Sequence, residues 1–352
     1  MGVSLLKENV GVLRGDAGNG RGCAGKCRKR APGELAVMRE YGGEMRAARG
    51  GVSKYSPYRR FRPAGGLWSA GGLWPANLLL ALALAGCGQG GYETQTPGGD
   101  RVKEWFLPLD GGRIEALAVW PPGNGPRPAL LLIHAGKSRA QRFRRTMFRL
   151  AGMGFTAMSI SLPGFGDSTG PEDFAGPRSV RAVLEAVKYL ASRQDVRTGG
   201  IGIYGIGQGA TAALLAAIRS RNFHPAALEN GVYGLDKAYP KLPPALRERL
   251  RSLLGGSPRE KPGTYRVRSP IHEAGNLRGP VLIIHSKDSK RFPFSEAIRL
   301  AGALEKRGLP HRFVTTRGRL REFRPGHPSI RRWVVPFMLK HLRPKIPKGV
   351  RP

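Results

Sequence analysis

The stretch Ile201-Gly-Ile-Tyr-Gly-Ile-Gly-Gln-Gly-Ala210 indicates how this chain folds. Its last part, Gly205 to Gly209, has the glycine spacing of the G-x-S-x-G turn, in which a nucleophilic serine stands between a strand and a helix. Residues 201–204 predict a short buried strand, and the alanine- and leucine-rich run 210–219 predicts a helix, so the turn has the context that it requires. The serine position is occupied by Gly207, which has no oxygen with which to attack a substrate.

Strands and helices alternate on both sides of this turn. We expect strands at residues 102–107, 114–120, 129–133, 155–161, 281–284 and 311–314. We expect helices at residues 141–151, 180–191, 295–307 and 329–342. The first two strands are joined by Asp110-Gly111-Gly112, which is a hairpin signal. The remaining alternation predicts an α/β fold, with a mostly parallel central sheet and helices on both faces.

One α/β domain with an N-terminal extension accounts for the length of 352 residues. We place this domain at residues 101–343 and a basic tail at residues 344–352. Residues 232–268 interrupt the alternation and can form short helices, so we expect a small lid over the carboxyl edge of the sheet. Residues 1–75 are rich in Gly and Arg and lack periodicity, and we expect them to be disordered or to precede the true start of the protein.

Residues 76–87 have the layout of a secretory signal, with an apolar segment that follows a group of arginines. This segment is shorter than the roughly 20 residues that a membrane-spanning helix needs. Its end, Leu84-Ala-Gly-Cys87, resembles the bacterial lipobox, in which the cysteine carries a lipid and begins the mature chain. The resemblance predicts an exported lipoprotein of a bacterial envelope, anchored to the membrane through Cys87, with residues 88–100 as a flexible tether. The alternative is a small apolar helix that ends at a chance cysteine.

The chain is strongly basic, with 59 Lys and Arg residues against 24 Asp and Glu residues and a net charge of +35. Such a charge favours contact with anionic surfaces, including phospholipid headgroups. The arginines are spread along the chain and accompany no nucleic-acid-binding motif, so we expect no dedicated binding of nucleic acid. The sequence gives no indication of the oligomeric state.

Cysteine and histidine are used sparingly. The other two cysteines, Cys23 and Cys27, precede Cys87, so the predicted domain has no thiol for a disulfide framework or a thiolate metal site. The seven histidines show neither H-x-x-x-H nor H-x-H spacing. His134 and His285 end predicted core strands, where we expect them to pack. We therefore expect no metal and no other cofactor.

Three further motifs accompany the glycine-rich turn. They are His134-Ala-Gly136, the segment Leu162-Pro-Gly-Phe-Gly-Asp-Ser-Thr-Gly-Pro171, and residues 283–293. In this order they resemble the oxyanion strand end, the Gly-x-Gly-x-Ser-x-Gly loop and the acid-bearing segment of the α/β-hydrolase superfamily, in the branch of dienelactone-hydrolase-like and acyl-peptidase-like serine hydrolases. The resemblance covers residues 101–343 and implies an α/β-hydrolase fold. It also implies hydrolysis of an ester or peptide by a serine, a histidine and an acidic residue.

The resemblance also assigns the three catalytic positions. The nucleophile position is Gly207, and the acid position is Ser289, with Asp288 one residue before it. The base position is Arg321, while His327 lies six residues further along. If the family motifs are aligned without gaps, none of the three catalytic residues is present. If the loops follow a different path, Asp288 can serve as the acid and His327 as the base, and only the nucleophile is missing.

The first function that we consider is a catalytically inactive, membrane-tethered binding module. Without the serine no acyl-enzyme forms at this turn, and glycine avoids the strain of a nucleophile turn there. In this hypothesis the vacated pocket binds the carboxylate or phosphate of an anionic small molecule through the backbone N–H groups of Gln208 and Gly136 and the guanidinium of Arg321. For the same pocket, an inert and water-filled remnant remains the alternative.

The second function is an active esterase or peptidase with a rearranged site. In this hypothesis Asp288 and His327 activate water directly, so that no serine is needed. Covalent labelling of an activated serine and the effect of replacing Asp288 or His327 distinguish the two functions.

Overall fold

The structure is a computed structural model that describes residues 91–317 and 329–346. The expected extension at residues 1–75 and the signal segment that ends at Cys87 lie outside the described residues, and so do Arg321 and His327. No helix in the described part of the chain is long and apolar enough to cross a membrane.

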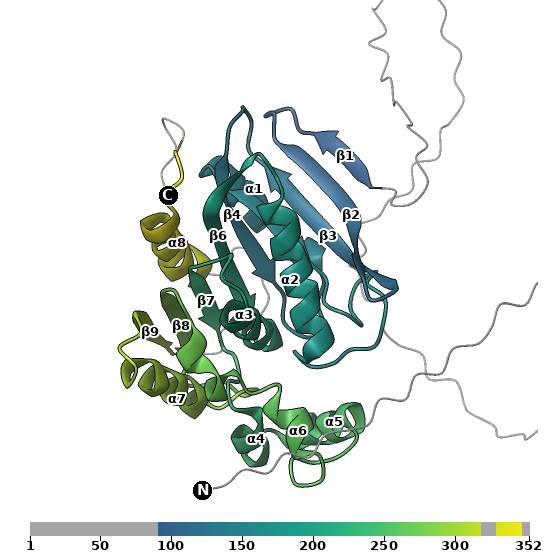
Figure 1. Cartoon of the computed structure of the whole chain (residues 1–352), viewed down its shortest axis with the longest axis vertical. Helices are drawn as coiled ribbons and strands as arrows, with labels where there is room; N and C mark the ends of the chain where they lie inside the picture. The colour runs from purple at the N-terminus through teal and green to yellow at the C-terminus, as the bar shows by residue number, and fades with distance from the viewer. Residues whose placement is uncertain (1–90, 318–328, 347–352) are drawn as a thin grey trace, which may run out of the picture. The chain divides into compact units, whose positions relative to one another are not determined.

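A nine-stranded sheet has the strand order β1-β2-β3-β5-β4-β6-β7-β8-β9 (Figure 1). The strands are β1 (Tyr92–Gln95), β2 (Arg101–Leu109), β3 (Gly112–Trp120), β4 (Arg127–Ile133), β5 (Thr156–Ile160), β6 (Val196–Ile206), β7 (Ala226–Glu229), β8 (Val281–Ser286) and β9 (His311–Thr316). β2 and β3 form the expected hairpin, in which Asp110 and Gly111 have φ angles of 46° and 75°. β3 pairs antiparallel with β5, and every pair from β5 to β9 is parallel. The expected mostly parallel sheet is confirmed.

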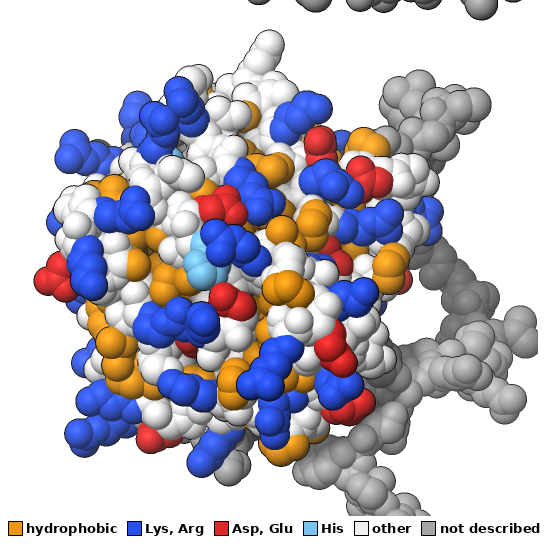
Figure 2. Space-filling view, turned by 60° about the horizontal axis from the view of Figure 1, so that its bottom comes forward, with side chains coloured by type: hydrophobic (Ala, Val, Ile, Leu, Met, Phe, Trp, Pro, Cys, Tyr) orange, Lys and Arg blue, Asp and Glu red, His pale blue; other side chains and the backbone are white. Residues whose placement is uncertain are grey.

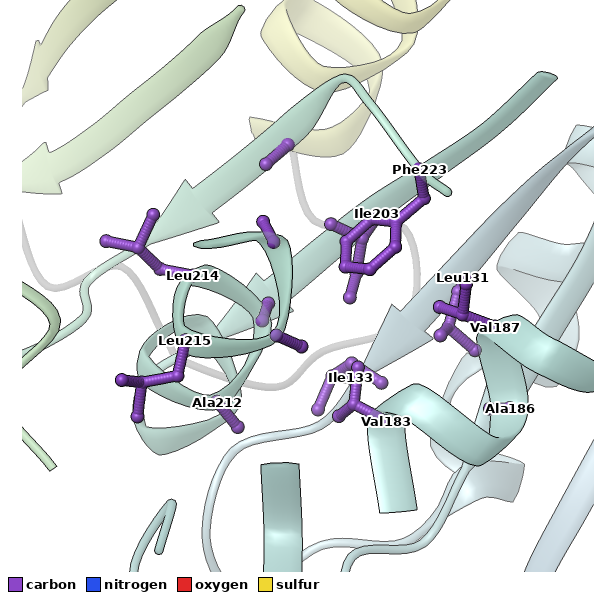
Figure 3. Close-up of a cluster of buried hydrophobic side chains, with 14 of the residues drawn as sticks. Leu131, Ile133, Val183, Ala186, Val187, Ile203, Ala212, Leu214, Leu215 and Phe223 are labelled. Atoms are coloured by element: carbon purple, nitrogen blue, oxygen red, sulfur yellow. The ribbon is translucent and has the colours of Figure 1, made fainter. Parts of the chain in front are cut away.

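Helices cover both faces of this sheet, as expected. They are α1 (Arg144–Gly152), α2 (Pro177–Ala191), α3 (Gln208–Arg219), α7 (Phe294–Glu305) and α8 (Val335–Leu342). α2, α3 and α7 contribute to the core on one face, and α1 and α8 to the core on the other. Figure 3 shows Leu131 and Ile133 of β4 beside Val183 and Val187 of α2, all four of them buried. Burying such a side chain contributes about 1.5–3 kcal/mol, so these contacts hold β4 and the neighbouring β6 firmly in place.

Two short strands were not expected from the sequence. β1 lies within residues 88–100, where we expected a flexible tether, and it pairs antiparallel with β2. All four of its side chains are exposed, so no hydrophobic pattern distinguishes it from a linker. β7 has only four residues, which is too short to show a period, yet it occupies the position between β6 and β8. The folded domain therefore begins nearer to Tyr92 than to Arg101.

The segment that we expected to form a lid contains three short α-helices between β7 and β8. They are α4 (Leu235–Ala238), α5 (Pro244–Leu254) and α6 (Pro262–Arg266), and Figure 1 shows them together below the sheet. α5 buries Leu246, Leu250 and Leu254, which lie on one side of the helix because they are four residues apart. These leucines belong to a small apolar cluster that also includes Phe174 and Phe292. Through Phe292 the lid is joined to the loop that follows β8.

Figure 2 shows the face that carries the lid, where Lys and Arg side chains are spread among hydrophobic and other groups, with fewer Asp and Glu side chains between them. The charge excess of the sequence therefore appears on this face as many separate cations. A binding site for an anion must be identified from the residues that line a particular cavity, because the general charge does not mark one.

Candidate functional site

The glycine-rich turn joins β6 directly to α3. Gly207 lies at the junction with a φ of 58° and a ψ of −124°. Its N–H donates to the carbonyl oxygen of Glu229 at 2.8 Å, and its own carbonyl accepts from the N–H of Ala210 at 3.0 Å. A residue with a side chain would be strained in this conformation by about 1–3 kcal/mol, whereas glycine is not. The strand, turn and helix that the sequence predicted around Gly207 are all present.

The two outer glycines are required by close packing. A Cβ atom at Gly205 would lie 2.4 Å from the carbonyl oxygen of Gly209. A Cβ atom at Gly209 would lie 2.3 Å from the carbonyl oxygen of His134, at the end of β4. Real Cβ atoms essentially never approach other atoms this closely, so any side chain at these positions forces the backbone apart.

The space at Gly207 is different. A Cβ atom there would lie 3.2 Å from the Cβ atom of Ala135 and 3.6 Å from a ring carbon of Phe292. These contacts are tight but not prohibitive, so the φ angle, more than the lack of room, favours glycine at this position. Ala135 and Phe292 are thus the residues that a side chain at this position would contact first.

A buried amide group lies beside the turn. The Gln208 side chain is 1% exposed, and its Oε1 and Nε2 atoms have no hydrogen-bond partner among the described residues. A Cβ atom at Gly136 would lie 3.0 Å from this Oε1 atom and 3.1 Å from the Nη2 atom of Arg291. The backbone of Gly136, the Gln208 amide and the Arg291 guanidinium therefore meet at one point. An unsatisfied buried polar group costs about 1–3 kcal/mol, so this arrangement suits a bound polar ligand.

Sequence reasoning did not identify Arg291, although it lies within the motif at residues 283–293. From that motif only the acid position was predicted. Nothing in the local sequence spacing indicates that Arg291 lies near the end of β4. The guanidinium also lies over the ring of Phe292, at 5.6 Å from the ring centre. The structure thus adds a cation to the expected anion-binding groups, Gly136 and Gln208, which it brings together.

The two candidates for the acid position follow β8. Asp288 is exposed, and its backbone N–H donates to the Ser286 hydroxyl at 3.2 Å. Ser289 is half-buried, and its hydroxyl accepts from the backbone N–H of Phe292 at 3.4 Å. Neither residue is among the near neighbours of a Cβ atom at Gly207, whereas Phe292 is. Arg321 and His327, the base candidates, lie outside the described residues.

The two core histidines are packing residues, as expected. The Nε2 atom of His134 accepts from the backbone N–H of Leu162 at 2.9 Å, so the neutral ring carries its proton on Nδ1, which donates to the Ala135 carbonyl at 2.6 Å. Burial lowers the pKa of His134 to about 4 and the pKa of His285 to about 4. Within the ranges that the structure describes, no group of three His, Cys, Asp or Glu residues is arranged to hold a metal ion.

A buried carboxyl group lies behind the turn. Glu229 is 3% exposed, and the Tyr204 hydroxyl donates to its Oε2 atom. Burial raises the pKa of Glu229, which favours its neutral form, and burial also raises the pKa of Tyr204 well above its usual range. Burial therefore weakens the tendency of this carboxyl group to ionise.

The depressed pKa values of the two histidines predict a loss of stability in acid. Each ring has an ordinary pKa of 6.5 when unfolded and about 4 when folded, so the unfolded chain binds more protons between these values. The stabilisation is fully present above pH 6.5 and is lost as the pH falls to about 4, on the order of 3 kcal/mol for each histidine. Urea unfolding across this range measures it. The His285→Gln variant should show a weaker dependence of the unfolding free energy on pH. The His311→Gln variant, at the start of β9, should keep the dependence of the unmodified chain. A flat profile in the unmodified chain would contradict the prediction.

Comparison with known proteins places this fold among peptidases and esterases. Residues 172–319 match the prolyl oligopeptidase family, and residues 110–232 match the X-Pro dipeptidyl-peptidase S15 family. The uncharacterized peptidase YtmA of Bacillus subtilis is 25% identical over 203 residues, which are 57% of this chain and 78% of that protein. Acyl-coenzyme A thioesterase 3 of Mus musculus is 30% identical over 125 residues, which are 36% of this chain and 28% of that protein.

Solved structures show the same fold. A puromycin-hydrolyzing peptidase of Mycobacterium tuberculosis matches 74% of this chain and 42% of its own length, with a TM-score of 0.61 and 20% identity. An acetyl xylan esterase from Paenibacillus sp. R4 matches 72% of this chain and 88% of its own length, with a TM-score of 0.59 and 17% identity. The chain thus spans less than half of the mycobacterial peptidase and of the mouse thioesterase, but most of the esterase.

Proposed function

We propose that this chain, a member of the α/β-hydrolase superfamily with the fold of serine peptidases and esterases, is a catalytically inactive binding module. The observation that carries the proposal is Gly207, which stands at the turn between β6 and α3 with the positive φ of a nucleophile position and no side-chain oxygen. A serine hydrolase forms its covalent intermediate on that oxygen. The fold is retained in this proposal, and the acyl-transfer step is lost.

The vacated pocket, in our proposal, binds the carboxylate or phosphate of a small molecule. The N–H of Gln208 lies in the first turn of α3, where backbone N–H groups have no partner within the helix and the helix dipole favours a negative charge. The side-chain amide of the same residue has no hydrogen-bond partner among the described residues, and it is a second and independent feature that suits a ligand. Gly136 and the guanidinium of Arg291 lie beside it, and Arg321 remains a further candidate cation outside the described residues.

The proposed location follows from the segment that ends at Cys87, which resembles a lipobox. A lipid on this cysteine would hold the domain at the membrane of a bacterial envelope. Metabolic labelling with a radioactive fatty acid tests this part of the proposal. Incorporation that is lost in a Cys87→Ser variant would support it, and absence of incorporation in the unmodified chain would contradict it.

The test of inactivity is covalent labelling. The full-length chain is expected to remain unlabelled by a fluorophosphonate probe, because such probes react with an activated serine and the turn holds Gly207. Labelling followed by gel fluorescence measures this, together with hydrolysis of an activated ester. Ester turnover that disappears in both the Asp288→Asn and the His327→Ala variants would contradict the proposal and favour an active hydrolase with a rearranged site.

A Gly207→Ser variant separates the loss of the nucleophile from the loss of its partners. We expect this variant to remain unlabelled, because Asp288 is exposed and ungapped counting puts Arg321 at the base position. Labelling of the variant but not of the unmodified chain would show that a competent acid and base survive. That result would mean that the loss of the serine at position 207 is the only change that abolishes catalysis.

A further inference from the structure

An open groove with a volume of about 890 Å³ lies next to the end of β4, and Gly207 and Gln208 are not among its lining residues. It is formed by the segment that leads from β4 into α1 and by the loop that follows β5. The lining residues are Lys137, Ser138, Arg139, Gln141, Arg142, Arg144, Arg145, Gly164, Phe165 and Gly166. Five of these residues are cations and none is an acid, which is a local concentration of positive charge.

Two of the five cations are neutralised by neighbouring acids. Arg139 pairs with Glu115 at 2.6 Å and with Asp167 at 2.8 Å. Arg144 pairs with Glu104. Lys137, Arg142 and Arg145 have exposed side chains and form no ion pair with any residue of the described ranges.

The groove is a rigid concavity because its walls are fixed by a buried network around Glu115. This carboxylate is 5% exposed, and it accepts from Gln141 at 2.5 Å and from the backbone N–H of Asp167 at 3.2 Å. Hydrogen bonds from Ser161, Arg139 and Gln141 outweigh burial and keep the pKa of Glu115 below its usual value. The opposite wall packs against the same group, since a Cβ atom at Gly166 would lie 2.1 Å from Glu115.

Lys137, which lines the groove, has a strained backbone conformation. Its φ is 60°, in the left-handed region that a residue with a side chain rarely adopts. Such strain costs about 1–3 kcal/mol and is common where a side chain must point in one direction. Lys137 directly follows Gly136, so its position is set by the end of β4.

We infer that this groove binds a ligand with several clustered phosphate groups. A ligand with one carboxylate group would neutralise only one of the cations. Lys137, Arg142 and Arg145 together match a ligand with about three negative charges. Arginine presents a planar fork that bonds phosphate oxygens in pairs, and the N-terminus of α1 in the same segment also favours an anion. A soluble polyphosphate and a phospholipid headgroup share this chemistry. The inference does not depend on whether the pocket at Gly207 binds an anion.

Inorganic tripolyphosphate is the probe that tests the groove. We expect the full-length chain to bind it in titration calorimetry at about 50 mM salt, and the triple variant Lys137→Ala, Arg142→Ala, Arg145→Ala to bind at least about 10-fold more weakly. The matched control is the triple variant Arg221→Ala, Lys306→Ala, Arg312→Ala, which removes the same charge from exposed positions at the opposite edge of the sheet. All six side chains are exposed, so both variants keep the core intact.

A second arm distinguishes the two sources of phosphate. The same three proteins are sedimented with vesicles that contain phosphatidylglycerol and with vesicles of phosphatidylcholine alone. Loss of tripolyphosphate binding only in the groove variant supports a soluble ligand, and loss of binding to anionic vesicles only in the groove variant supports a headgroup. The inference is overturned if the control variant loses as much affinity as the groove variant, or if the unmodified chain binds neither probe.

Discussion

Replacing Gly209 with alanine is expected to lower the free energy of unfolding by at least about 3 kcal/mol. The added Cβ atom would lie 2.3 Å from the carbonyl oxygen of His134 and 2.7 Å from that of Ile133. Both are backbone atoms at the end of a central strand, so the contacts are relieved only if α3 moves away from β4. That movement would open the packing between them, which includes the buried Ala212 and Leu214. Urea unfolding followed by circular dichroism measures the change.

Two further glycine-to-alanine variants complete this series. Gly302 lies within α7 with no atom within 4 Å of its added Cβ, so Gly302→Ala should raise stability by about 0.5–1 kcal/mol. Gly207→Ala should cost about 1–3 kcal/mol, because its φ is positive although space is available. If the Gly209→Ala variant is as stable as the Gly302→Ala variant, the inference that the turn packs too closely against β4 for a side chain is wrong.

The parts of the fold that the sequence predicted are those with a local physical signal. The glycine spacing of the turn occurs in many loops, and it becomes informative here because the flanking strand and helix have distinct composition. The leucine run of β4 is buried on both faces, which makes it apolar throughout and recognisable. The helix α5 was predictable because Pro243 and Pro244 begin a run with leucines at helical spacing.

The parts that could not be predicted depend on contacts between segments that lie far apart in the sequence. β1 has four exposed side chains, and only its backbone pairing with β2 makes it a strand. Arg291 reaches Gly136 because β8 and β4 end at the same edge of one parallel sheet. Counting residues from a catalytic motif cannot reveal that meeting, since it arises from the order of the strands.

The surroundings of Gly207 favour an anion for reasons that do not involve catalysis. Behind the turn, burial raises the pKa of Glu229, and its carboxyl group accepts a hydrogen bond from the Tyr204 hydroxyl. Beside the turn are the start of α3, the backbone of Gly136 and the guanidinium of Arg291. An oxyanion site that serves a reaction stabilises charge only transiently, whereas the same groups without a nucleophile can hold a stable anion.

Removing the guanidinium beside this pocket is expected to weaken binding of an anion strongly. Hydrogen bonds to charged groups contribute about 1.5–3 kcal/mol, so Arg291→Ala should lower the affinity for inorganic phosphate or acetate about 10- to 100-fold. Titration calorimetry with the full-length chain measures the affinity. Arg312→Ala, an exposed arginine at the opposite edge of the sheet, is the matched control and should leave the affinity nearly unchanged.

A Gln208→Leu variant tests the same pocket without changing its charge. Because the buried amide has no partner among the described residues, leucine at this position should preserve or slightly raise the stability of the protein. Its affinity for phosphate should nevertheless fall, since the amide then no longer contacts the ligand. Unchanged affinity in both Arg291→Ala and Gln208→Leu would contradict an anion site at Gly207 and leave the pocket as a water-filled remnant. An equal loss in Arg312→Ala would instead attribute the binding to the general positive charge of the chain.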